Sequence, residues 1–108
     1  MKYILTSNQI KFHRACKRLT EKIFEAKDNA HNAENNHNYL AYEKYLALAD
    51  LYRYAKSTLV DAYARDKEAD MLVLFRYIKC LAISKHNEYF AEAVQIIVDI
   101  YKELEKEI

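Results

Sequence analysis

The stretch 88–108, EYFAEAVQIIVDIYKELEKEI, decides the fold class of this chain. Its large apolar residues recur at alternating spacings of four and three positions, which is the pattern of a helix that packs against other helices. They are Phe90, Val94, Ile97, Tyr101, Leu104 and Ile108. Charged residues of the stretch fall away from this seam. The pattern therefore predicts a long helix over residues 87–107 that packs in a bundle.

The composition of the whole chain excludes most other folds. None of the 108 residues is a glycine or a proline. Glycine is the usual residue for positive φ and proline the usual helix breaker, so glycine-rich phosphate loops and tight hairpins are not expected. A sandwich or barrel would need a turn about every 8–12 residues. We therefore predict one all-α domain over residues 1–108.

Three earlier segments have helical periodicity as well. Thr6 and Gln9 have the spacing of a capping box, after which apolar residues recur every three or four positions to about residue 30. The asparagine-rich segment 28–38, DNAHNAENNHN, is predicted to be the main loop, because asparagine competes for backbone hydrogen bonds. The predicted fold is thus a four-helix bundle, with helices over approximately 7–30, 38–65, 68–83 and 87–107.

Residues 71–83, MLVLFRYIKCLAI, form the most apolar segment. A buried strand is an alternative, but the length and the lack of turn residues favour a helix at the centre of the bundle or in a subunit interface. Whether residues 65–68 form a tight turn or a bend in a continuous helix stays open. The third and fourth helices offer more apolar surface than four short helices hide, so completion of the bundle by dimerisation is a further expectation.

Positive charge is concentrated at the start of the chain. Residues 1–27 hold seven basic and two acidic side chains, a net charge of +5, whereas the whole chain has +1. Basic residues of this first helix form one edge, which suits an acidic protein surface, an anionic membrane face or the phosphates of a nucleic acid. A solvated edge that pairs with acids of a neighbouring helix is the alternative. The candidate partner-binding residues of this basic edge are Lys11, Arg14, Arg18 and Lys22, together with Lys17, which lies further round the helix.

Two tyrosines indicate a second candidate surface. Tyr39 and Tyr54 fall on the side of the second helix opposite its core stripe, near Glu43 and Asp50. Exposed tyrosines give contact area at low entropic cost and are favoured in interfaces. Packing against the first helix or a loop is the alternative for both. Tyr39 and Tyr54 complete the set of candidate partner-binding residues.

No motif in the sequence predicts chemistry. The four histidines lack the spacing of metal ligands. Cys16 and Cys80 fall in or beside apolar stripes, where reduced cysteine acts as a small hydrophobe. We therefore expect no catalytic residue, no metal ligand and no cofactor.

The function predicted from these features is a non-enzymatic protein–protein interaction domain, a small adaptor or inhibitor that binds a partner through helix surfaces. The alternative is a nucleic-acid-binding bundle that uses the basic edge, although the net charge of +1 argues against it. Residues 1–6 contain an apolar run shorter than that of a signal peptide, and no segment approaches ~18 uncharged apolar residues. We expect a cytoplasmic protein without a signal peptide or membrane span.

Overall fold

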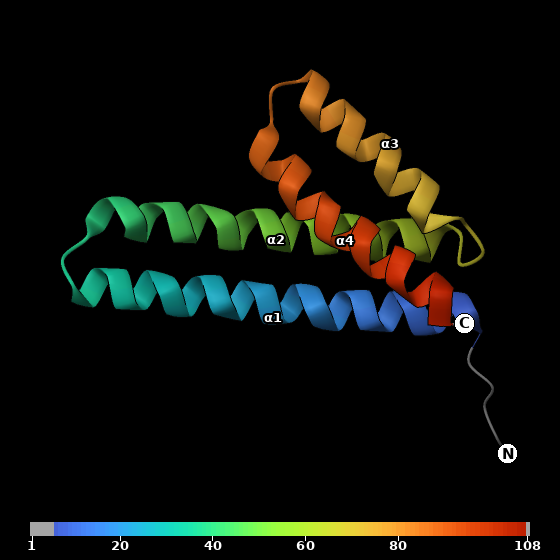
Figure 1. Cartoon of the computed structure of the whole chain (residues 1–108), viewed down its shortest axis with the longest axis horizontal. Helices are drawn as coiled ribbons and strands as arrows, with labels where there is room; N and C mark the ends of the chain where they lie inside the picture. The colour runs from blue at the N-terminus through green and yellow to red at the C-terminus, as the bar shows by residue number, and fades with distance from the viewer. Residues whose placement is uncertain (1–5, 108) are drawn as a thin grey trace, which may run out of the picture.

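Two helical hairpins make up the chain in the computed structural model (Figure 1). The first joins α1 (Ser7–Asn35) to α2 (Tyr39–Arg65), and the second joins α3 (Met71–Ser84) to α4 (Glu88–Glu107). The structure describes residues 6–107, except for the side chains at 104, 106 and 107, and has no strand among them. The start of the chain at 1–5, Ile108 and the Leu104 side chain lie outside the described residues. The predicted all-α four-helix bundle is confirmed.

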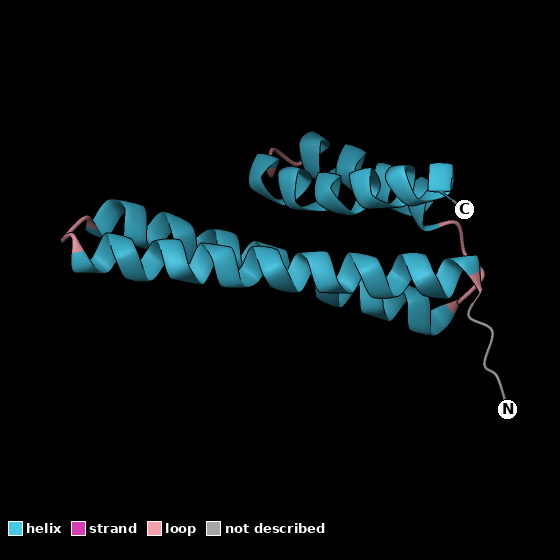
Figure 2. Cartoon of the chain, turned by 60° about the horizontal axis from the view of Figure 1, so that its bottom comes forward, coloured by secondary structure: helices cyan, strands magenta, loops and turns pink. Residues whose placement is uncertain are grey.

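The two hairpins lie in separate layers, as Figure 2 shows. Helix α4 joins the layers, because it contacts α1, α2 and α3. Helices α1 and α2 are 29 and 27 residues long, whereas α3 and α4 have 14 and 20. The second hairpin therefore covers only the part of the first that lies toward the N-terminal end of the chain (Figure 1).

The core lies where α4 meets the other three helices. Its largest fully buried side chains come from all four helices: Leu19, Leu59, Phe75, Val94 and Ile97. Burial of a side chain of this size contributes about 1.5–3 kcal/mol. The seam predicted for α4 faces this core, with Val94, Ile97 and Tyr101 buried and Phe90 packed at its edge.

Helix α1 is longer than predicted. The segment 28–38 was expected to be a loop, but α1 continues to Asn35 and only residues 36–38 connect it to α2. His37 in this connection has a positive φ of 58°, and Asn38 caps α2 through its side chain. The loop prediction was wrong because small side chains continue the buried stripe while the asparagines face solvent. The buried residues are Ala26, Ala30 and Ala33.

Residues 66–70 separate α2 from α3, so the chain turns here and does not continue as one helix. The carboxylate of Asp70 accepts hydrogen bonds from the backbone N–H groups of Leu72 and Val73, at 3.1 and 3.3 Å. This N-cap satisfies donors that have no partner within the helix. Helix α3 consequently begins at Met71, three residues later than predicted.

Helix α3 is not the central helix of the bundle, which was one of the two positions that the sequence predicted for it. Phe75 is fully buried, but Val73 and Tyr77 on the other side of α3 are 61% and 62% exposed. The central position belongs to α4, which lies diagonally across α1 and α2 and also contacts α3 (Figure 1). A helix with apolar residues on all sides has apolar surface to bury. Its sequence does not show which of those sides the neighbouring helices cover.

Candidate functional site

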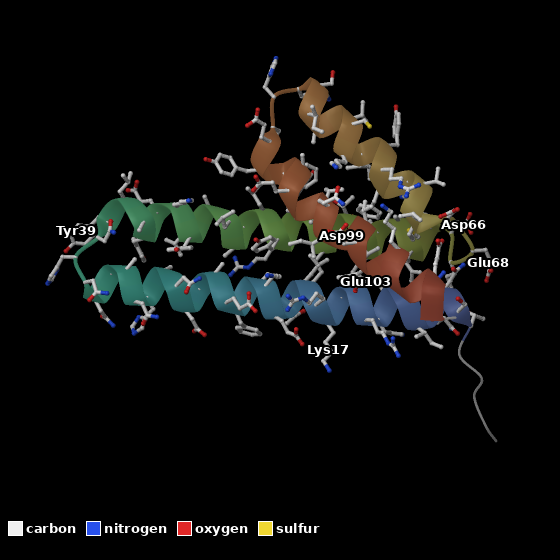
Figure 3. The ribbon with its side chains drawn as sticks, viewed as in Figure 1. Lys17, Tyr39, Asp66, Glu68, Asp99 and Glu103 are labelled. Carbon is white, nitrogen blue, oxygen red and sulfur yellow. The ribbon has the colours of Figure 1, made fainter. Side chains whose placement is uncertain are left out.

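The basic edge of α1 is partly neutralised by carboxylates of its own helix. Arg18 Nη1 lies 3.2 Å from Glu21 Oε2 and 3.8 Å from Glu25 Oε1. Lys22 Nζ lies 3.4 Å from Glu25 Oε2. Lys17 is exposed and points away from the other helices in Figure 3. These ion pairs of Arg18 and Lys22 form within α1, whereas the sequence suggested pairing with a neighbouring helix.

The other two cations of the edge lie nearer the start of α1. Lys11 is partly buried and Arg14 is exposed. Phe12, next to Lys11 in the sequence, has its ring stacked on Tyr63 of α2, with ring centroids 3.9 Å apart. A single-stranded nucleic acid needs aromatic faces on which its bases can stack. The face of the Phe12 ring that is stacked on Tyr63 is therefore not open to a base.

Tyr39 and Tyr54 are 60% and 61% exposed, on α2 as the sequence indicated. The Tyr39 hydroxyl lies 3.3 Å from Nδ1 of His37 at the tip of the first hairpin. The Tyr54 ring packs against the Phe90 ring of α4, with centroids 5.0 Å apart. Fifteen positions separate the two tyrosines on one helix, about 22 Å. The structure therefore does not bring them together in one site.

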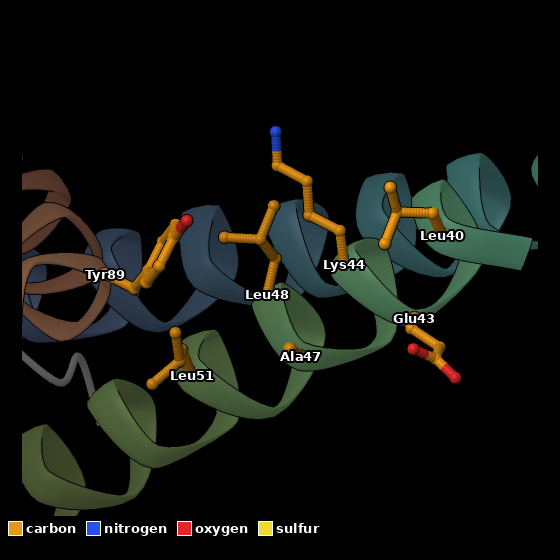
Figure 4. A pocket seen from close by; sticks show the side chains of 7 residues that line it. All are labelled: Leu40, Glu43, Lys44, Ala47, Leu48, Leu51 and Tyr89. Atoms are coloured by element: carbon orange, nitrogen blue, oxygen red, sulfur yellow. The ribbon is translucent and has the colours of Figure 1, made fainter.

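A groove on α2 beside the start of α4 was missed by the sequence analysis (Figure 4). Its open volume is about 310 Å³. Leu40 is 82% exposed there, and Tyr89 projects from the first turn of α4 toward Leu48 and Leu51 (Figure 4). We call this surface the distal groove, and its lining residues are Leu40, Glu43, Lys44, Ala47, Leu48, Leu51 and Tyr89.

The distal groove adjoins the part of the first hairpin that α4 covers, since Tyr89 of α4 is one of its lining residues. Leu48 also lines a hollow of about 210 Å³ between α1 and α2, together with Tyr45 and Tyr52. Burial, and then the nearby carboxylates of Glu92 on α4 and Glu25 on α1, raise the pKa of Tyr52. Tyr52 therefore lies near both α1 and the N-terminal half of α4. Toward the hairpin tip, Leu40 and Ala47 of α2 are exposed in the distal groove, and no helix among the described residues covers them.

A buried cluster near the other end of α4 involves Tyr101 and Cys16. Among the described residues, the Tyr101 hydroxyl is the buried side-chain polar atom without a hydrogen-bond partner. Burial, with Cys16 and Tyr63 close by, raises the pKa of Tyr101 well above its ordinary value. Burial also raises the pKa of the Cys16 thiol, against the opposing effect of Lys56. A thiol of raised pKa is a poor nucleophile, so the cluster fits a structural role.

Comparisons with known proteins add no constraint, because no family model, curated protein or solved structure matches this chain. In the described part of the chain, no three histidine, cysteine or acidic side chains are placed to hold a metal ion. No helix among residues 6–107 combines the length and apolar character needed to cross a bilayer. Function is therefore inferred from the surfaces described above.

Proposed function

We propose that this chain is a non-enzymatic protein-interaction domain that binds one amphipathic helix of a partner protein in the distal groove. The supporting observation is continuity: α4 packs as a helix on the same side of the first hairpin, and the distal groove begins where α4 begins. A second helix laid end to end with α4 would bury the apolar lining. Such a domain acts by occupying a surface of its partner, as a small adaptor or inhibitor in the cytoplasm would.

The groove defines the helix that would fit. Leu40, Ala47 and Leu51 lie along one side of α2, and from the first to the last the helix rises about 17 Å. An incoming helix of roughly three turns, with large aliphatic residues at i, i+4 and i+7, covers that length. Glu43 and Lys44 lie at the rim, where they suit polar residues beside the aliphatic stripe.

Of the candidate residues predicted from the sequence, this proposal places Tyr39 at the groove and leaves the others outside it. Tyr39 immediately precedes Leu40 and would contact the partner at the open end of the groove. Tyr54 lies against α4 outside the distal groove, and the basic edge is on α1, so both are separate candidate contacts. Burial of Leu40 alone is worth about 1.5–3 kcal/mol, which makes it the residue expected to matter most.

The test is affinity capture with four forms of the full chain in parallel. They are the natural chain, the groove variant Leu40→Glu/Ala47→Glu, the control Leu46→Glu on another side of α2, and the basic-edge variant Arg14→Glu/Arg18→Glu. All substituted residues are at least partly exposed, and equal helical circular dichroism verifies folding. We expect a partner that the natural chain and the control retain and the groove variant loses.

A synthetic peptide from the contact region of that partner then gives the quantitative result. It should become helical on binding and bind the groove variant at least tenfold more weakly than the control. Equal affinity for both would contradict the proposal. Loss of binding only in the basic-edge variant would move the site to α1, and nucleic acid that binds with a steep salt dependence would favour the alternative function.

A further inference from the structure

We propose that the outward face of α3 packs, in antiparallel orientation, against α3 of a second copy of this chain. The face consists of Val73, Tyr77, Cys80 and Ser84, all of them exposed. It is separate from the distal groove, so this inference goes beyond the proposed function and does not depend on it. The occupant we infer is a second copy because the face is complementary to itself in shape and in charge.

The spacing of the four residues is that of a helix–helix seam. Intervals of four, three and four positions keep them on one line along α3. Phe75 lies on the opposite side of the helix and is fully buried in the core of its own chain. Helix α3 thus has two apolar sides, and its own bundle covers one of them.

The sizes of the side chains favour antiparallel pairing. A two-fold axis between residues 78 and 79 places Tyr77 opposite the partner's Cys80 and Val73 opposite the partner's Ser84. Each larger side chain then meets a smaller one, which allows close packing. Parallel pairing would instead set Tyr77 against the partner's Tyr77 and Cys80 against the partner's Cys80, so that large meets large.

Charges at the two ends of α3 favour the same orientation. The turn before α3 holds Asp66, Glu68 and Asp70 against Lys67, a net negative charge, and Figure 3 labels Asp66 and Glu68 there. Lys79 and Lys85 against Glu88 give a net positive charge toward the other end of α3. None of these side chains forms an ion pair with another described residue. An antiparallel pair brings the acidic end of each copy to the lysine-containing end of the other, and it also opposes the two helix dipoles favourably.

The length of α3 sets the strength of the association. Fourteen residues give a helix of about 21 Å. A stable interface of standard size needs about 800 Å² from each partner, which one face of so short a helix does not supply. We therefore expect a reversible dimer that forms as the concentration rises from micromolar to millimolar.

Sedimentation equilibrium over that concentration range tests the association. Tyr77→Glu is the disrupting variant and Tyr39→Glu is its matched control, since the two tyrosines are 62% and 60% exposed. The natural chain and the control should approach twice the monomer mass, and Tyr77→Glu should lose at least tenfold in association constant. A natural chain that stays monomeric at millimolar concentration, or equal dimerisation of Tyr77→Glu, would overturn the proposal.

Disulfide trapping tests the orientation in a Cys16→Ser/Cys80→Ser background. With oxidised glutathione as the oxidant, Val73→Cys combined with Ser84→Cys should form covalent dimers, and each substitution alone should not. Dimers from the single variants as readily as from the double variant would show parallel pairing and reject the proposed geometry. The groove variant Leu40→Glu/Ala47→Glu should dimerise normally, which separates this result from that of the proposed function.

Discussion

The ring of Phe12, in α1, lies flat on the ring of Tyr63, in α2, with centroids 3.9 Å apart and planes 6° from parallel. This stack closes the end of the first hairpin that has no connecting loop. Tyr63 also lies close enough to Tyr101 of α4 to contribute to the raised pKa of Tyr101. The two hairpins are therefore joined at one aromatic cluster.

The stack should contribute a measurable coupling energy. We expect Phe12→Leu and Tyr63→Leu to lower the free energy of unfolding non-additively, with a coupling of about 0.5–1.5 kcal/mol. Urea unfolding of the two single variants and the double variant measures it. Phe24→Leu, at an exposed ring, is the control and should change stability little. Simple additivity of the two substitutions would show that the rings do not stabilise one another.

Removal of the Tyr101 hydroxyl should not harm the fold. The hydroxyl is buried without a hydrogen-bond partner, and such a group costs about 1–3 kcal/mol. Tyr101→Phe is therefore expected to leave the free energy of unfolding unchanged or to raise it by about 1 kcal/mol. Tyr101→Ala, which also removes the ring, should lower it by about 3–5 kcal/mol. Marked destabilisation by Tyr101→Phe would mean that the hydroxyl has a partner in solution.

Stability should decline at alkaline pH. Burial raises the pKa of Cys16 and of Tyr101, whose ordinary values are 9.0 and 10.0, so the folded chain keeps protons that the unfolded chain releases. Their contribution is fully present below the unfolded-state values and is lost as the pH rises above them. Urea midpoints measured from neutral pH to beyond pH 10 should fall for the natural chain and fall less for Cys16→Ala/Tyr101→Phe. Parallel declines would assign the effect to other groups.

The N-cap of α3 should be worth about 1 kcal/mol. Asp70→Ala removes the acceptor of two backbone N–H groups, whereas Asp70→Asn keeps a side-chain oxygen in place. We expect the alanine variant to lose about 0.5–2 kcal/mol in the free energy of unfolding and the asparagine variant to lose less. Amide hydrogen exchange should quicken first in α3. If Asp61→Ala, an exposed control on α2, has the same effect as Asp70→Ala, the cap does not carry this energy.

Features of the helices could be predicted where residues close together in the sequence determine them. The Thr6 capping box is present, with both of its hydrogen bonds, and the seam of α4 faces the core. The end of α1 was missed because alanines such as Ala30 and Ala33 bury a stripe that carries little hydrophobic signal. The pairing of Arg18 with Glu21 is an i, i+3 contact, so helical spacing already contained it.

The surfaces proposed for binding depend on relations that are not local. The distal groove exists because the first hairpin is longer than the second. The sequence around Leu40 and Leu51 does not predict where along α2 the covering by α4 begins. The apolar character of residues 71–83 predicted a helix whose surface is buried. It did not show whether the bundle itself or a second subunit covers that surface. The structure covers one side of α3 and exposes Tyr77 on the other.

Thiol reactivity measures most directly whether α4 is central and α3 faces outward. In the Cys16→Ser/Cys80→Ser background at low micromolar concentration, where α3 should not self-associate, Tyr77→Cys and Val94→Cys are each exposed to a thiol reagent. The thiol introduced by Tyr77→Cys should react nearly as fast as in denaturant, and that from Val94→Cys at least about a hundredfold more slowly, because it reacts only after opening of the fold. Equal protection at both positions would place α3 inside the bundle and contradict this arrangement.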